Sequence, residues 1–166
     1  MDIRFENRYK VNELMLREYA YKVVSRNIAL MSVGVFLLGL VVLVVATANN
    51  DRLLLGMAGV CMIIAVFAGM LTPQLVLREI HATSDRLNNG KKYETMVRFG
   101  EKITMEEGTT VMQFEYSQIT RIYNLKHSYV LMLGKQNGII LSKTGFMNND
   151  FKEFRQFIQK KTGKKG

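Results

Sequence analysis

The stretch IALMSVGVFLLGLVVLVVATA occupies residues 28–48, and after the tetrapeptide NNDR the stretch LLLGMAGVCMIIAVFAGML occupies residues 53–71. Neither apolar run contains Lys, Arg, Asp or Glu. At about 1.5 Å per helical residue, each run would reach roughly 28 to 32 Å, which is long enough to cross the hydrocarbon core of a bilayer. Because the connection between them is so short, the two runs predict an antiparallel transmembrane hairpin with both chain termini on one side.

The distribution of basic residues predicts which side that is. Arg17, Lys22 and Arg26 are among six basic residues that precede the first run, and Arg78 is the first of several that follow the second, whereas the connection holds only Arg52. Positive charge collects on the cytoplasmic side of membrane proteins. We therefore expect a two-span protein of the cell membrane with both termini in the cytoplasm. The sequence Ala-Thr-Ala at residues 46–48 resembles a signal-peptide cleavage site, but the length of the first run and the second run that follows at once favour a membrane span.

The two runs carry small residues and no ionisable ones. Ion and proton pathways need polar groups at membrane depth, so the composition argues against transport. Small residues let helices approach each other closely, and we expect them to pack the two spans together; homodimerisation through the same face stays open. Pro73 predicts a kink or a break after the second run. The small residues are Ser32, Gly34, Gly39, Gly56, Gly59, Ala65 and Gly69.

The hairpin divides the chain into three parts. Residues 1–27 form a cytoplasmic amphipathic segment, in which Asn12 is suited to cap a helix over residues 12–27. That helix would lie in the membrane interface or pack on the cytoplasmic domain, and the sequence does not choose between them. Upstream of it, we expect only a short extended segment. Residues 28–89 comprise the hairpin and a juxtamembrane helix that ends at Gly90.

Residues 90–166 form a small cytoplasmic sheet domain. From Lys92 onward the hydrophobic period changes from helical to alternating, which predicts strands over residues 93–99, 103–105, 110–116, 129–133 and 139–141. A helical turn is expected near Tyr116, and the segment Lys135-Gln136-Asn137-Gly138 predicts a hairpin. The final helix begins with a capping box of Asp150 and Glu153. Its apolar face is formed by Phe151, Phe154, Phe157 and Ile158. The predicted fold class is an α+β membrane protein, with a transmembrane hairpin followed by an antiparallel sheet and a C-terminal helix.

This order of features resembles the YcxB-like proteins of bacteria. The resemblance is carried by the hairpin, by Tyr116-x-x-Ile119-x-x-Ile122, by Leu141-Ser142-Lys143, by Phe146 and by the Phe-rich final helix. The family often has Pro where this chain has Ser142. The resemblance implies a pleckstrin-homology-like (PH-like) fold for the sheet domain and a membrane protein of uncharacterised role. It implies no catalytic or ligand-binding residues.

The sequence offers no constellation typical of an enzyme. His81 and His127 are the only histidines, and neither has Cys, Asp or Glu at metal-ligand spacing beside it. His127 falls in a predicted turn, where we expect an exposed side chain. Cys61, the only cysteine, lies within the second apolar run and cannot form an intrachain disulfide. We therefore expect no catalytic, cofactor-binding or metal-binding residues, and no cofactor.

The charge and the predicted topology of the chain are compatible with two binding functions. The first is a membrane-tethered interaction or scaffolding module, whose sheet domain binds an unknown protein partner by strand addition. The second is a reader of anionic lipid head groups, since the chain carries a net charge of +9. The tail residues Lys160, Lys161, Lys164 and Lys165 would bind the lipid, although these lysines also suit a plain solubilising role. Nucleic-acid binding is not expected, because the basic residues are scattered among acidic ones.

Overall fold

The computed structural model describes every residue except 1–2, 89–93, 135–136, 148–150 and 165–166, and it leaves out the side chains of residues 84–88. The chain separates into two compact units. One unit combines Met1–Tyr19 with Ile80–Gly166, and the other is Ala20–Glu79. The first contains all the strands of the described residues and the second contains the two apolar runs, so the chain is an α+β protein with two long apolar helices.

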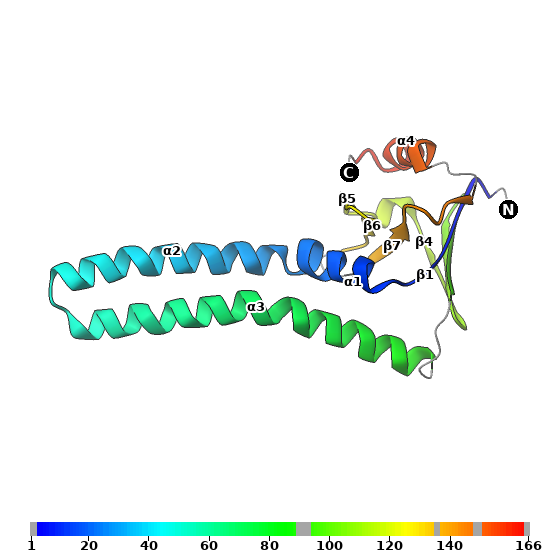
Figure 1. Cartoon of the computed structure of the whole chain (residues 1–166). Coiled ribbons are helices and arrows are strands. Elements are labelled where there is room, and N and C mark those ends of the chain that lie inside the picture. The colour runs from blue at the N-terminus through cyan, green and yellow to red at the C-terminus, as the bar shows by residue number, and fades with distance from the viewer. Residues whose placement is uncertain (1–2, 89–93, 135–136, 148–150, 165–166) are drawn as a thin grey trace. The chain divides into compact units, whose positions relative to one another are not determined.

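The two apolar runs lie in α2 (Arg26–Ala48) and α3 (Arg52–Asn88), which form a helical hairpin (Figure 1). The turn between them is held by short-range hydrogen bonds. The Asn49 amide donates to the Val45 carbonyl over 3.1 Å, and Asn50 adopts a left-handed φ of 53°, which Asn tolerates better than most residues. Asp51 caps α3, because its Oδ1 accepts from the Leu53 amide at 3.1 Å and the Leu54 amide at 3.0 Å. The expected hairpin is therefore confirmed.

Some of the small residues pack the hairpin together, and others do not. A Cβ on Gly39 would lie 2.4 Å from Met62 Cγ, and one on Gly69 would lie 3.3 Å from Ser32 Cβ, so both glycines permit close contact. Ala65 is also buried. A Cβ on Gly34, Gly56 or Gly59 would meet open space, so these three glycines do not serve packing between the helices.

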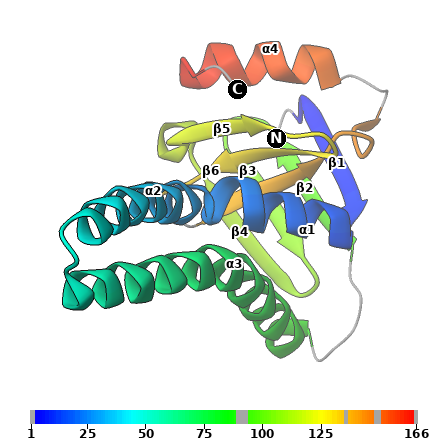
Figure 2. The same cartoon turned by 60° about the vertical axis from the view of Figure 1, so that its left-hand side comes forward.

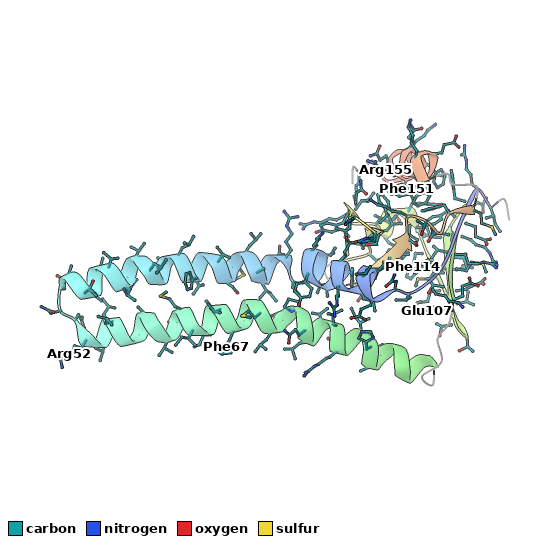
Figure 3. All side chains as sticks on the ribbon, in the orientation of Figure 1. Arg52, Phe67, Glu107, Phe114, Phe151 and Arg155 are labelled. Atoms are coloured by element: carbon teal, nitrogen blue, oxygen red, sulfur yellow. The ribbon has the colours of Figure 1, made fainter. Side chains whose placement is uncertain are left out.

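Most of the apolar surface of α2 and α3 is exposed. Within the most apolar window of each helix, only 6% of the residues of α2 and 11% of those of α3 are buried. Phe67, for example, is 58% exposed (Figure 3). By length and composition both helices are able to cross a membrane.

The helix α3 continues through Pro73, so of the expected kink or break only the break is excluded. Another expectation about the helices was wrong. The expected single helix over residues 12–27 is instead α1 (Glu13–Tyr19) followed by a π-helical turn, η1 (Ala20–Val24). Within η1 the Ser25 amide donates to the Ala20 carbonyl five residues back, the bond that defines a π turn. The Asn12 cap is confirmed, since Asn12 Oδ1 accepts from the Leu14 amide at 3.1 Å.

The other unit contains two antiparallel sheets, which Figure 2 shows beside α4. The first has the order β1-β2-β3-β4 and the second the order β5-β6-β7. The strands and the remaining helices are β1 (Phe5–Lys10), β2 (Glu94–Phe99), β3 (Ile103–Glu107), β4 (Thr110–Phe114), η2 (Tyr116–Gln118), β5 (Arg121–Asn124), β6 (Ser128–Met132), β7 (Gly138–Ser142) and α4 (Phe151–Thr162).

Most predicted elements of this unit are confirmed, and two strands were missed. The pattern located β2, β3, β4, η2, β6, β7 and α4, but not β1 or β5. The missed β1 pairs with β2 in a register that sets Phe5 opposite Phe99. The N-terminal segment is thus part of the sheet domain. Other expectations concern Gly90, Lys91, Lys92, Tyr93, Lys135, Gln136 and Asp150, all of which lie outside the described residues.

The core of this unit lies between the two sheets and α4. Phe154 is fully buried, and its ring lies 4.5 Å from that of Phe146 and 4.7 Å from that of Phe99. The same ring contacts Phe5 of β1 at 5.7 Å and Tyr129 of β6 at 6.0 Å. One helix face therefore joins residues of both sheets, and the predicted apolar face of α4 is confirmed.

Candidate functional site

Two of the four tail lysines make contacts within the domain. The Nζ of Lys161 lies 5.4 Å from the centre of the Tyr116 ring, and the Nζ of Lys164 donates to the Ile119 carbonyl. Both contacts fix the end of α4 against the segment around η2. Lys160 is exposed, and Lys165 lies outside the described residues. The tail lysines therefore serve partly in packing, which leaves less free charge for a lipid surface than the sequence alone indicated.

The most densely bonded carboxylate among the described residues is that of Glu18, on α1. It accepts hydrogen bonds from the backbone amides of Lys126 at 3.1 Å and His127 at 3.0 Å, and from Ser128 Oγ at 3.1 Å. His127 Nδ1 lies 3.3 Å from the same carboxylate. These donors all belong to the connection between β5 and β6 or to the first residue of β6. Glu18 thus fastens α1 to the second sheet.

The surroundings of Glu18 favour its charged form. Burial raises the pKa of this carboxyl, but the amide and hydroxyl hydrogen bonds and the charge of His127 together lower the pKa below its ordinary value of 4.5. His127 itself is 42% exposed at its side chain. Because Ser128 Oγ donates to Glu18 and not to His127, the three residues have the bonding of a structural clamp rather than that of an activated nucleophile.

The second histidine also has an acidic neighbour. His81 Nε2 lies 3.5 Å from Glu13 of α1, and both side chains are about half exposed. Sequence reasoning missed both pairs, because the two glutamates lie far from the histidines along the chain. Within the described part of the chain, no group of three or more His, Cys, Asp and Glu side chains is arranged to hold a metal ion.

A cationic cluster lies at the first half of α4. Lys143, which follows β7, places its Nζ 5.4 Å from the centre of the Phe151 ring, and the Tyr129 ring lies 5.4 Å from the same ring. Arg155 stands one helical turn beyond Phe151, and Figure 3 labels both on α4. We refer to Tyr129, Lys143 and Arg155 as the α4 cluster.

The strand β4 forms one edge of the first sheet. Among the described residues it pairs with β3 alone. Its sequence, Thr-Val-Met-Gln-Phe, contains no charged residue and no Pro, and Val111 is 63% exposed. Proteins usually protect exposed sheet edges with charged residues, Pro or covering segments. The β4 edge has neither a charged residue nor Pro to protect it.

Comparison with known proteins shows a similarity in the C-terminal part of the chain. Residues 100–158 match the model of the family described as YcxB-like protein. This part of the sheet domain is therefore similar to YcxB-like proteins. No curated protein and no solved structure matches the chain.

The YcxB-like segment contains most of the features described above. It covers β4, the Glu18-binding connection between β5 and β6, and all three residues of the α4 cluster. The contributions of Glu18 and of β1 come from outside the matched segment, although they complete the same compact unit.

Proposed function

We propose that the protein is a membrane-tethered interaction module without catalytic activity. In this proposal α2 and α3 cross the cell membrane, both termini are cytoplasmic, and the YcxB-like domain has a PH-like fold. The domain binds an extended segment of a partner protein along β4. The uncharged, exposed edge of β4 is the observation that carries this proposal.

Membrane insertion is supported by the exposed surface of the hairpin. A core helix of a soluble protein buries its apolar residues, whereas in this hairpin large side chains such as Leu53, at 75% exposure, and Met31, at 70%, face outward. A soluble protein rarely leaves so continuous an apolar surface uncovered. The cytoplasmic placement of both termini is supported by the basic residues that flank the two spans.

A PH-like fold is supported by the order of the strands. Four antiparallel strands in one sheet are followed by three in a second, and a C-terminal helix packs where the two sheets meet. The sequence of these elements is interrupted only once, since the hairpin lies between β1 and β2. The first strand of the domain therefore precedes the transmembrane hairpin in the sequence, and the remaining strands follow it.

The geometry of the β3–β4 hairpin indicates which backbone groups are available. The turn consists of two residues and begins with Gly108, whose φ is 60°. In such a hairpin the flanking pair, Glu107 and Thr110, exchanges hydrogen bonds, and bonded pairs then alternate. The amides of Val111 and Gln113 accordingly face away from β3, where an added strand would bind them.

Photo-cross-linking in membranes tests this proposal. A photoreactive residue in place of Val111 in the full-length chain should form a discrete adduct with a partner protein in intact bacterial cells. The matched control is Met147, which is 58% exposed and apolar but lies outside β4. Placed there, the same photoreactive residue should give no such adduct.

A proline substitution separates strand addition from simple proximity. Gln113→Pro removes an amide that points away from β3, so it should leave the sheet folded, since edge strands tolerate Pro. It should abolish the adduct formed at position 111. An adduct that persists in the Gln113→Pro chain, or that is equally strong from position 147, would exclude β4 as the docking strand.

A further inference from the structure

The α4 cluster combines like charges with buried polar atoms whose hydrogen bonding is incomplete. Tyr129 is fully buried, and its hydroxyl interacts with the Arg155 side chain but makes no hydrogen bond of standard geometry among the described residues. The Nε of Arg155 is also buried and without a hydrogen-bond partner there. Buried polar groups are nearly always satisfied, because a buried donor without an acceptor loses its hydration and gains nothing in return.

The three side chains of the cluster converge around one ring. Phe151 contacts both Lys143 and Tyr129, at 5.4 Å in each case. Arg155 stands four residues after Phe151 on the same helix, and residues at this spacing share a helix face. Three segments far apart in the sequence, the start of β6, the residue after β7 and the first turns of α4, thus bring their polar groups together.

The electrostatic surroundings agree with this arrangement. Burial lowers the pKa of Lys143, the charge of Glu18 raises it, and the smaller effect of the Arg155 charge lowers it. Burial raises the pKa of Tyr129, and the charge of Arg155 and its side-chain hydrogen bond with the tyrosine oppose that rise. The carboxylate of Glu18 is already occupied by the amides and hydroxyl at residues 126–128. At Lys143 the attraction of Glu18 therefore outweighs the repulsion of Arg155, while the Nε of Arg155 itself has no acceptor among the described residues.

We propose that Tyr129, Lys143 and Arg155 form a binding site for a phosphate group. A phosphate oxygen accepts hydrogen bonds from a buried hydroxyl and from a guanidinium N–H, and its negative charge attracts both Lys143 and Arg155. The phosphate belongs to a soluble compound or to a lipid head group. This site does not involve β4 and is independent of the proposed docking of a partner protein.

Thermal unfolding of the full-length protein in neutral detergent micelles tests the site. Inorganic phosphate should raise the unfolding midpoint above that measured in chloride at equal ionic strength, because a ligand that binds only the folded state stabilises it. Tyr129→Phe removes the hydroxyl beside Arg155 and little else. It should leave the midpoint in chloride unchanged or higher, and it should reduce the rise caused by phosphate.

A second tyrosine provides the matched control. The hydroxyl of Tyr116 donates to the Gly100 carbonyl over 2.9 Å, so this hydroxyl has a partner. Tyr116→Phe should therefore lower the midpoint equally in chloride and in phosphate. If Tyr129→Phe behaves in the same way as Tyr116→Phe, the Tyr129 hydroxyl has no role in phosphate binding and the proposal fails.

Calorimetric titration distinguishes the two sources of phosphate. Inorganic phosphate and short-chain phosphatidic acid are each titrated into the wild-type protein and into Arg155→Gln. Loss of the guanidinium should weaken binding of the ligand by about tenfold or more, whereas Lys152→Gln, an exposed change on the same helix, should not. Similar binding of both ligands indicates the phosphate group alone, and binding of the lipid alone indicates a head group. Absence of binding by both ligands, or equal binding by wild type and Arg155→Gln, would overturn the proposal.

Discussion

Glu18 shows how one side chain joins distant parts of this chain. Its donors lie 108 to 110 residues further along the sequence, in the connection that precedes β6 and at the first residue of β6. Sequence reasoning placed this residue on an amphipathic helix and assigned it no partner. No local pattern reveals that amides at residues 126 and 127 need an acceptor, because that need arises only when the two sheets and α1 assemble.

Replacement of Glu18 should destabilise the domain in a pH-dependent way. In Glu18→Gln the side-chain amide turns an NH₂ group toward donors, which should cost about 1 to 3 kcal/mol of folding free energy at pH 7. The folded-state pKa of Glu18 lies below its ordinary value of 4.5, so the charged carboxyl stabilises the domain above that value. This stabilisation is lost as the pH falls through the folded-state pKa.

Unfolding of both proteins at pH 7 and at pH 3.5 measures this effect. The difference in stability between wild type and Glu18→Gln should shrink at the lower pH. The matched control on the same helix is Glu13→Gln, whose side chain is 52% exposed and pairs with Arg17 at 3.2 Å. An exposed pair of this kind contributes roughly 0.3 to 0.5 kcal/mol. A difference for Glu18→Gln that is no larger than this control would contradict the role of Glu18 as a clamp.

The strands that were predicted and those that were missed differ in what their own residues reveal. In β2 the alternation is complete, since Thr95, Val97 and Phe99 are all buried. In β1 the inward positions include Asn7, which breaks the apolar pattern. That side chain is nevertheless buried, because its Nδ2 donates to the Ser142 carbonyl at 2.8 Å and its Oδ1 accepts from the Ser142 amide at 3.1 Å. The partner that makes Asn7 suitable for a strand is invisible in the local sequence.

The missed β5 and the α4 cluster illustrate the same limit. The strand β5 has only four residues, too few for an alternation to stand out from the helical spacing of Ile119 and Ile122. The cluster combines Tyr129, Lys143 and Arg155, which share no motif and no spacing. By contrast, the four tail lysines are conspicuous in the sequence, although Lys161 and Lys164 prove to contact the domain itself.

The helix α4 should be the element on which the stability of the domain depends most. Phe154→Ala removes a fully buried ring that contacts rings of β1, β2 and β6, and it should cost about 3 to 5 kcal/mol. Gln156→Ala, an exposed change on the same helix, should stay within about 0.5 kcal/mol. Because Phe5 packs on Phe154, the first variant should also speed hydrogen exchange of the β1 amides. Unchanged exchange in β1 would show that α4 does not hold this strand.

The placement of the hairpin within the sequence has a consequence for the chain as a whole. Strand β1 precedes the two apolar helices, and its partner β2 follows them, with a register that runs from Phe5–Phe99 to Lys10–Glu94. A strand can pair with another only if both are in the same compartment. The pairing of β1 with β2 therefore requires an even number of membrane crossings between them, and α2 and α3 supply two such helices. This argument is independent of the distribution of basic residues, and it supports only the part of the proposed topology that puts both termini on one side of the membrane.

Cysteine labelling tests both the crossing and its direction. In a Cys61→Ala background, Asn49→Cys places a thiol in the connection between α2 and α3, and Lys160→Cys places one on an exposed position of α4. A membrane-impermeant maleimide added to intact bacterial cells should label position 49 and not position 160, because the basic flanks favour the cytoplasm. After the cells are made permeable, both positions should be labelled. Labelling of position 160 alone in intact cells would reverse the orientation, and equal labelling of both positions would show that the hairpin does not span the membrane.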